Sequence, residues 1–330
     1  MKKQLIFLVA IASLFVACNK ESVTRDGEQT TLTVELSGST HVTRATAGVN
    51  ETKVNSTQVF VFKQNGNYDG YAAASSSTVK VSCTVGERIV CAVVNAPALD
   101  GVASLSDLQA KVSDFAENNA ASFVMYGSES KSIAANTSVS VSVSRLVAKV
   151  SINGITTDWT ADAYKNAEFK ITGIYMINVA GDYPYCGVYG INGTAPAHTS
   201  TIWYNKRGNQ GECQSLLSDS ITPVTLPNKG SYTTTHSFYV YPNFTTEDND
   251  SANWCPRKTR LVIETTLNGE TMYYPISFKK LEPNRTYTVT ALTITRPGSE
   301  HPDSPLDIED VNYTVVVTDW ITGETITEKI

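Results

Sequence analysis

Apolar and polar residues alternate along most of this chain, and the alternation predicts β-strands separated by turns. The segment TLTVELSG places Leu32, Val34 and Leu36 on one face of a strand. The next segment, STQVFVFKQNGNYDGY, predicts a strand that ends in the turn signal Asn65-Gly66. The chain therefore begins as a β-protein.

Three further segments complete the first half of the pattern. STVKVSCTVGERIVCAVVNAP predicts a hairpin around Gly86-Glu87. SLSDLQAKVSDF has helical spacing, with Ser104 as the N-cap and Asp107 three residues later. The apolar face of this helix would carry Leu105, Leu108, Val112 and Phe115. SVSVSVSRLVAKVSING then predicts one long alternating strand.

A pause in the alternation at NGITTDWTADAYKNA predicts a domain boundary. A second set of strands follows in EFKITGIYMINVAG, HSFYVYPNF, TRLVIETTLNGETMYYPISF and NRTYTVTALTITRPG, with a hairpin on Asn268-Gly269. An irregular insertion at about 181–232 interrupts this set. The whole pattern predicts an all-β chain of two tandem β-sandwich domains with a short helix in the first.

The insertion contains aromatic residues that could line a ligand surface or could pack an otherwise irregular loop. These residues are Tyr183, Tyr185, Tyr189, Trp203 and Tyr204. The acidic run EDND at 247–250 could bind Ca²⁺ or be a solvated loop, and it lacks the glycine and glutamate of an EF-hand.

The N-terminus predicts export. Lys2 and Lys3 precede the apolar run from Leu5 to Ala17, which is too short to span a bilayer. The ending LFVAC resembles a bacterial lipobox, in which Cys18 would be acylated and become the new N-terminus. The alternative is an ordinary signal peptide cleaved nearby. Two or more acyl chains would anchor the protein stably, whereas one would not.

Composition and charge narrow the function classes. Only 18% of residues are charged, and the chain is rich in Thr, Ser, Val and Tyr, which favours strands. The net charge of −6 argues against nucleic acid as a partner, because phosphate binding requires a basic surface. The four histidines have no spacing typical of a nucleophilic or metal site. We therefore expect no enzyme activity, cofactor or metal.

Beyond Cys18, five cysteines remain, with no CxxC spacing and no zinc pattern. Cys83 and Cys91 flank the expected hairpin and would face each other only if the strand register allowed it. Buried free thiols are the alternative. The other three are Cys186, Cys213 and Cys255.

The C-terminal segment differs from the rest of the chain. RPGSEHPDSPLDIED contains three prolines, Pro297, Pro302 and Pro305, and predicts an extended linker. VNYTVVVTDWITGETITEKI then predicts a strand, and one of its faces carries Val311, Tyr313, Val315 and Val317. This strand could fold back onto its own domain, or the linker could carry it to a neighbouring molecule.

Removing the strand of Leu32, Val34 and Leu36 would expose an apolar groove and unpaired backbone groups. The C-terminal strand has a suitable pattern to fill such a groove by strand addition. Arg44 lies where a cut would separate the first strand from its domain, whereas a cut after Arg25 would release only the lipid. The alternative is that Arg44 is simply a solvated charge.

Several segments together resemble the fimbrillin family, the subunits of type V pili. They are LFVAC, LTVELSGSTHVTRA, VVNAP followed by a helix, RLVAKV and YTVVVTDW. The resemblance implies transthyretin-like sandwiches, export as a lipoprotein, cleavage by an arginine-specific protease and polymerisation by donor-strand exchange. It assigns lipidation to Cys18, the scissile pair to Arg44 and Ala45, and the donor strand to Val311 through Trp320.

The resemblance also implies a stalk subunit of a cell-surface fimbrium, with an outer-membrane lipoprotein as its precursor. Its partners would be other copies of itself, other fimbrial subunits, the protease, and the membrane through the lipid before cleavage. Val59 and Val61 are candidates for the acceptor groove by position. The alternative functions are a fimbrial tip adhesin or a surface lipoprotein that binds glycan or host protein.

The expected divisions of the chain follow from these assignments. They are a signal peptide at 1–17, a lipidated propeptide with a removable strand at 18–44, β-sandwich domains at 45–158 and 159–296, and a proline-rich linker with the donor strand at 297–330.

Overall fold

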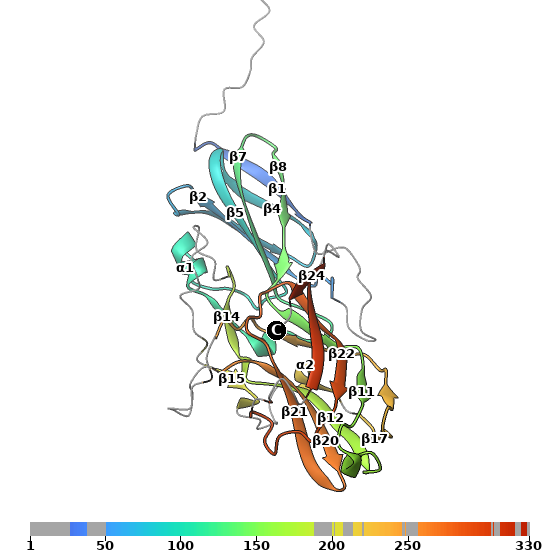
Figure 1. The fold of residues 1–330 in the computed structure, drawn as a ribbon. Helices are drawn as coiled ribbons and strands as arrows, with labels where there is room; N and C mark the ends of the chain where they lie inside the picture. The colour runs from blue at the N-terminus through green and yellow to red at the C-terminus, as the bar shows by residue number, and fades with distance from the viewer. Residues whose placement is uncertain are drawn as a thin grey trace, which may run out of the picture.

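The fold is almost entirely β, which confirms the predicted fold class (Figure 1). In the computed structural model, the N-terminal strands lie at one end of an elongated molecule and most of the C-terminal strands at the other (Figure 1). The residues described are 27–37, 51–187, 200, 202–206, 214–219, 221–245, 248, 257–304, 306, 311–320 and 325–328.

Two sheets form the N-terminal part. A three-stranded sheet contains, in spatial order, β4 (Thr78–Thr84), β1 (Gln29–Ser37) and β8 (Ser138–Ser142). A five-stranded sheet contains β3 (Tyr68–Ala74), β2 (Thr57–Lys63), β5 (Gly86–Val94), β7 (Met125–Ile133) and β9 (Ser144–Arg145). Alternate residues of both sheets meet in a valine-rich core, as expected for a β-sandwich.

The expected hairpin around Gly86-Glu87 is wrong. Strands β4 and β5 are consecutive, yet β4 pairs with β1 and β5 pairs with β2 and β7, in different sheets. Gly86 has a φ of 116°, a conformation that glycine adopts without steric cost where the chain changes sheet. Cys83 and Cys91 therefore lie in separate apolar clusters and are both free thiols.

The expected helix is shorter than its pattern predicts. Helix α1 (Leu105–Gln109) is followed by the strand β6 (Val112–Asp114) and the 3-10 turn η1 (Phe115–Glu117). The Ser104 cap is confirmed, since its side chain accepts a hydrogen bond from the Asp107 backbone N–H at 3.1 Å. Strand β6 pairs with β14 (Asp182–Pro184) of the insertion, and this tertiary pairing ends the helical conformation.

The single long strand expected from SVSVSVSRLVAKVSING is also wrong. The segment forms β8, β9 and β10 (Ala148–Ile152), and these three strands belong to three different sheets. Strand β10 and the following β11 (Ile155–Thr157) pair with β22 (Arg285–Ile294) at the C-terminal end of the molecule. The segment thus connects the two ends of the molecule. Strands β10 and β11 lie in the C-terminal sheet, although the predicted first domain extends to residue 158.

A glycine makes this passage between sheets possible. A Cβ added to Gly127 of β7 would clash with the Ser142 carbonyl oxygen and lie 3.1 Å from the Val143 Cα. We expect Gly127→Ala to lower the free energy of unfolding by about 1–3 kcal/mol, because backbone must shift. In Gly173→Ala the nearest atom, the Glu264 Cβ, lies 3.5 Å away, and the change should stay within about 0.5 kcal/mol. Urea denaturation measures both, and equal effects would contradict this account.

Two larger sheets form the C-terminal part. A seven-stranded sheet contains β18 (Ser231–Tyr232), β11, β22, β10 and β19 (His236–Val240), with β23 (Val311–Asp319) on β22 and β24 (Thr325–Glu328) on β23. A five-stranded sheet contains β16 (Ser218–Asp219), β12 (Phe169–Ile177), β20 (Arg260–Leu267) and β21 (Glu270–Ser277), with β17 (Val224–Thr225) on β12. The remaining elements are β13 (Val179–Ala180), β15 (Trp203–Tyr204), the 3-10 turn η2 (Asp162–Tyr164) and α2 (Gln214–Leu217).

The expected hairpin at Asn268-Gly269 is confirmed. Strands β20 and β21 pair from end to end, and both turn residues have positive φ values, 52° and 91°. The same holds in part for the Asn65-Gly66 turn between β2 and β3, where Gly66 has a φ of 84°. Both turns rest on local chemistry, which explains why the sequence indicates them.

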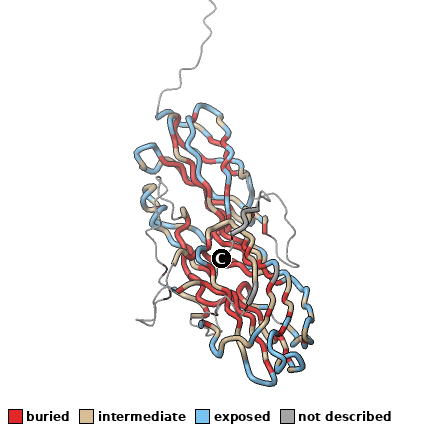
Figure 2. Tube along the Cα trace, viewed as in Figure 1, coloured by how far each residue is buried: buried red, intermediate tan, exposed pale blue. Residues whose placement is uncertain are grey.

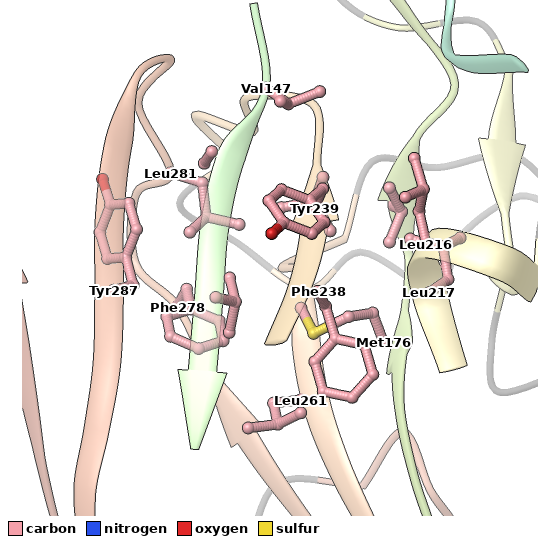
Figure 3. Packing of buried hydrophobic residues seen from close by; sticks show 14 of the residues in the cluster. Val147, Met176, Leu216, Leu217, Phe238, Tyr239, Leu261, Phe278, Leu281 and Tyr287 are labelled. Carbon is pink, nitrogen blue, oxygen red and sulfur yellow. The ribbon is translucent and has the colours of Figure 1, made fainter. Parts of the chain in front are cut away.

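A large apolar cluster fills the C-terminal part and extends past the junction with the N-terminal sheets. Buried residues follow the interior along the whole length of the molecule (Figure 2). In Figure 3, Leu216 and Leu217 of α2 lie beside Met176 and Phe238, which come from the two facing sheets. The cluster also contains Phe60, Phe62 and Val93 of the N-terminal sheet, so the two ends share a continuous interior.

Candidate functional site

Strand β1 occupies the centre of its three-stranded sheet. It pairs antiparallel with β4, where Leu32 faces Val81, and parallel with β8, where Leu36 faces Val141. Leu32 and Val34 are fully buried, and Leu36 is half-buried. Because β1 is the middle strand, its loss would leave unpaired backbone groups on both β4 and β8.

The floor beneath β1 is formed by the five-stranded sheet. Val59 and Val61 of β2 are fully buried in the same apolar cluster as Leu32 and Val34. The two valines named as groove candidates thus pack in the core that β1 covers. The remaining members of this cluster are Val79, Val81, Cys83, Val90, Ala92, Val94, Met125, Ile133, Val139, Val141 and Val143.

The C-terminal strand β23 lies on its own chain. It pairs antiparallel with β22 from Val311 opposite Ile294 to Asp319 opposite Arg285. Val315 is buried, and Tyr313 and Val317 pack against the large cluster. Of the two destinations that the sequence left open, the structure places this strand in the intramolecular one.

Trp320 fastens the end of β23 at the junction between the two parts of the molecule. Its indole lies under the Arg145 guanidinium, 4.6 Å from the ring centroid, and stacks on Tyr239 at 5.8 Å. Phe123 contacts it edge-on at 6.5 Å. The indole Nε1–H donates a hydrogen bond to a Glu51 carboxylate oxygen at 2.9 Å. Trp320 is only 2% exposed, so this hydrogen bond is shielded from water.

Glu51 is the anion of this cluster. Its carboxylate also accepts hydrogen bonds from Lys149 Nζ and from the Tyr239 hydroxyl, each at 2.7 Å. The Arg145 Nε–H donates to the Glu51 backbone carbonyl at 2.6 Å. Burial alone would raise the pKa of Glu51, but the bond and charge of Lys149 and the donors of Tyr239 and Trp320 together lower it. The carboxylate is therefore ionised at neutral pH.

The start of the expected linker is docked. Ser299 exchanges backbone hydrogen bonds with Tyr273 of β21, each at 2.8 Å. Asp303 is buried, forms an ion pair with Arg257 at 2.6 Å, and pairs with Arg260. The expectation of an extended linker from Pro297 onward is therefore wrong for residues 297–304, because buried charges hold this stretch on the C-terminal domain.

Asp303 belongs to a larger buried network. The Asn178 amide donates to its carboxylate at 2.8 Å, and Arg260 also pairs with Asp248 at 2.6 Å. Asp248 is the described member of the EDND run, and here it serves as a partner of arginine. Among the described residues, no group of three or more His, Cys, Asp or Glu side chains is arranged to hold a metal ion.

The aromatic insertion packs inward. Tyr183 and Tyr185 are each 2% exposed, and the Tyr185 hydroxyl donates to Glu117 at 2.6 Å. Trp203 and Tyr204 are half-buried against the large cluster. Packing, rather than a ligand surface, accounts for these four side chains.

The predicted processing residues lie outside the described part of the chain. They are Cys18, Arg44 and Ala45, and Arg25 also lies outside it. The same holds for Tyr189 of the aromatic insertion and for Cys213 and Cys255. In the described part, no helix is long and apolar enough to cross a membrane.

Sequence reasoning missed Glu51 and Asp303 entirely. Each is an acidic residue in a polar stretch, and nothing in its local pattern indicates burial. Trp320 and the RLVAKV segment, which contributes Arg145 and Lys149, were noted separately. Only tertiary structure brings them together, since Glu51 and Trp320 are 269 positions apart.

Comparisons with known proteins agree with this architecture. The chain is similar to a proposed cell adhesion protein from Bacteroides eggerthii, with a TM-score of 0.66 and 20% identity over 90% of this chain and 98% of that one. It is similar to a fimbrilin (FimA) from Porphyromonas gingivalis, with a TM-score of 0.61 and 18% identity over 90% and 98%. It is also similar to a C-terminally truncated tip fimbrial protein from the same organism, with a TM-score of 0.53 and 15% identity over 88% and 100%.

At these identities, the structural comparisons establish the fold. A search of curated proteins gave no match. In a separate comparison, residues 30–171 match the family model described as the major fimbrial subunit protein, FimA. This range runs from β1 into β12 and so includes the strand β1, its sheet partners and the RLVAKV segment. Residues 30–171, which are less than half of the 330-residue chain, are thus similar to the family of major fimbrial subunit proteins.

Proposed function

We propose that this protein is a structural stalk subunit of a cell-surface fimbrium, polymerised by exchange of its C-terminal strand. In this proposal the chain is exported as a lipoprotein acylated at Cys18 and is cleaved between Arg44 and Ala45. Cleavage removes β1 together with the lipid. The groove left by β1 then accepts the C-terminal strand of another subunit, and the fibre supports adhesion.

The observation that carries the proposal is the position of β1. It is the central strand of a sheet, with buried Leu32 and Val34 above Val59 and Val61, and it lies on the N-terminal side of Arg44. Loss of a central strand opens a slot with unpaired backbone on both sides, which only another strand satisfies fully. An edge strand would leave a single open edge.

The C-terminal strand offers a matching pattern. In β23, Tyr313, Val315 and Val317 share one face at period two, as Leu32, Val34 and Leu36 do in β1. A fully buried aliphatic side chain contributes about 1.5–3 kcal/mol, so three or four such residues offset much of the ordering cost of association. This burial favours filling of the groove when β1 is absent.

In this scheme, polymerisation replaces the contacts of β23 with its own chain by contacts with a neighbouring subunit. Strand β23 already pairs with β22, and its residues Val315 and Trp320 are buried. It must leave these contacts before it can enter a neighbouring groove. Buried ion pairs hold the linker at Asp303, and Leu306 packs against the large cluster, so the Leu306 contact must also open. The seven residues 304–310 would then span about 22 Å at about 3.1 Å each.

The experiment uses the chain from residue 19 onward, treated with a trace of arginine-specific protease and run unboiled on a gel. We expect a ladder whose subunits begin at Ala45. Arg44→Ala should remain monomeric, and Arg25→Ala is the matched control that should still polymerise. A truncation after Asp310 should be cleaved without forming a ladder.

Circular dichroism must show that the truncated chain is folded, since it lacks the buried Trp320. A clean monomer beginning at Ala45 would argue for a tip or binding role instead of a stalk role. Resistance of Arg44 to the protease in the folded chain would overturn the proposed maturation.

A further inference from the structure

We propose that Glu51 is a latch that holds the C-terminal strand on its own chain, and that opening this latch precedes strand exchange. The proposal rests on the proposed function for its consequence, but the contact itself can be tested without any polymer. The latch consists of Glu51, Arg145, Lys149, Tyr239 and Trp320.

The contacts converge on one buried carboxylate. One Glu51 oxygen accepts from Lys149 and Tyr239 at 2.7 Å each, and the other accepts from the Trp320 indole at 2.9 Å. All three donors are 8% exposed or less, and Glu51 is 4% exposed. Hydrogen bonds to a charged group are about twice as strong as neutral ones, and burial protects them from competition with water.

The latch grips the strand at its end, where release would begin. Trp320 directly follows β23, and its backbone N–H donates to the Asn284 carbonyl at 3.3 Å, just before β22. A strand that separates from an antiparallel partner opens first at an end, because terminal pairs have one neighbouring pair fewer. Fixing Trp320 therefore protects the pairs between β23 and β22 from opening at this end.

The latch also draws residues from the segment that joins the two parts of the molecule. Arg145 and Lys149 lie on the segment that leads from β9 into β10 and thus joins the N-terminal to the C-terminal sheets. Arg145 bonds the Glu51 backbone and covers the Trp320 ring. Without the Glu51 carboxylate, Lys149 would be a buried cation that has lost this ion pair, which is strongly unfavourable.

Glu51 is close in sequence to the proposed cleavage site. In the uncleaved chain, β1 ends at Ser37 and is paired with a strand on each side. The chain that leads to Glu51 therefore starts from a strand that is fixed in its sheet. After cleavage, only five residues, 46–50, separate Ala45 at the new terminus from Glu51. Residues near a chain end are the most easily displaced. Cleavage would thus weaken the latch in the same step that empties the groove.

The direct test is hydrogen exchange of the β23 amides in a chain that cannot be cleaved, Arg44→Ala. Glu51→Gln keeps the size of the side chain and removes its charge, and we expect it to speed β23 exchange about 10- to 100-fold. Trp320→Phe, which removes the indole donor and part of the ring surface that contacts Arg145 and Tyr239, should speed it in the same direction. Amides of β20 serve as the internal reference for global opening.

Glu264→Gln is the matched control. Glu264 accepts a hydrogen bond from a tyrosine hydroxyl at 3.1 Å, as Glu51 does, but it lies on β20 and is paired with β12 and β21. The β23 amides of the Glu264→Gln variant should exchange at the same rate as those of the Arg44→Ala chain without a second substitution. If Glu51→Gln left β23 exchange unchanged relative to β20, the latch would be wrong whatever happened on cleavage.

The consequence is tested in the cleavable chain. After trimming, Glu51→Gln should form the ladder several-fold faster than wild type, whereas Glu264→Gln should match wild type. Equal rates for Glu51→Gln and wild type would overturn the role of the latch in assembly. If wild type formed no ladder at all, the proposed function would fail, and the exchange experiment would still decide whether Glu51 holds the strand.

Discussion

Locking β23 to β22 with a disulfide is expected to abolish polymerisation, and a reductant should restore it. Thr288 and Val316 are directly opposed in the antiparallel pair of these strands, and both are half-buried. Opposed residues in antiparallel strands have Cα atoms about 4.5–5.5 Å apart, which a disulfide can span. Thr288→Cys with Val316→Cys would therefore keep the strand docked without removing any of its core residues.

The native cysteines of the described part of the chain should not compete with the engineered pair for disulfide formation. Burial raises the pKa of Cys83 and Cys91 to about 11 and that of Cys186 to about 12, so these thiols are protonated at neutral pH. Protonated, buried thiols react slowly with disulfides. Cys213→Ser and Cys255→Ser would be carried in every variant, which leaves the engineered pair as the reactive thiols.

The locked variant would be trimmed with arginine-specific protease and analysed on an unboiled gel with and without reductant. Thr266→Cys with Thr271→Cys is the matched control, since it places an equivalent disulfide across the hairpin of β20 and β21. This control should polymerise in both conditions. A ladder from the oxidised Thr288–Val316 lock would show that β23 need not leave β22, and the proposed strand exchange would have to be abandoned.

Replacing Asp303 with alanine is expected to lower the free energy of unfolding by about 3–5 kcal/mol. The Asp303 carboxylate is buried between Arg257 and Arg260 and also accepts from the Asn178 amide. Arg260 has a second acidic partner, Asp248, but the substitution still leaves buried guanidinium charge without its main compensation. Breaking one side of a buried ion pair costs far more than the intact pair contributes.

Denaturant unfolding of the uncleaved chain measures this loss. Asp303→Asn, which keeps the shape and one hydrogen-bond acceptor, should lose less than the alanine variant. Glu300→Ala, an exposed acidic residue in the same segment, should stay within about 0.5 kcal/mol of wild type. A loss below about 1 kcal/mol for Asp303→Ala would mean that the network does not hold the 297–304 segment in place.

Together these contacts give the C-terminal segment two separate attachments. Asp303 fastens its beginning through buried ion pairs, and Trp320 fastens the end of β23 through Glu51. In the proposed scheme, only the second attachment opens, so Asp303 defines where the moving segment starts. The experiments on Asp303 and Glu51 therefore probe different properties, stability in one case and release of the strand in the other.

The sequence by itself determined the features that depend on local chemistry. Alternation at period two identified the strands, including the face of Leu32 and Val34, and the Asn-Gly pairs identified two turns. Ser104 marked the start of the helix because an N-cap needs only its own side chain and the next backbone N–H groups. These features require no information about distant residues.

The tertiary structure decided how the strands are distributed among sheets. The β4 and β5 segments look like a hairpin in sequence, and 138–154 look like one strand, yet each passes between sheets. An alternating pattern fixes which side chains face inward, but not which neighbouring backbone completes the hydrogen bonds. For the same reason α1 is shorter than its sequence pattern predicts, because the residues that follow it form β6 and pair with β14.

The Glu51 latch and the buried network of Asp303 could be found only in three dimensions. Glu51 and Asp303 are single acidic residues, and such residues are normally solvated. Their burial is tolerated because Lys149 and Trp320 in one case, and two arginines in the other, come from distant parts of the chain. Compensation of a buried charge is a property of the folded neighbourhood, and a local sequence pattern has no means of recording it.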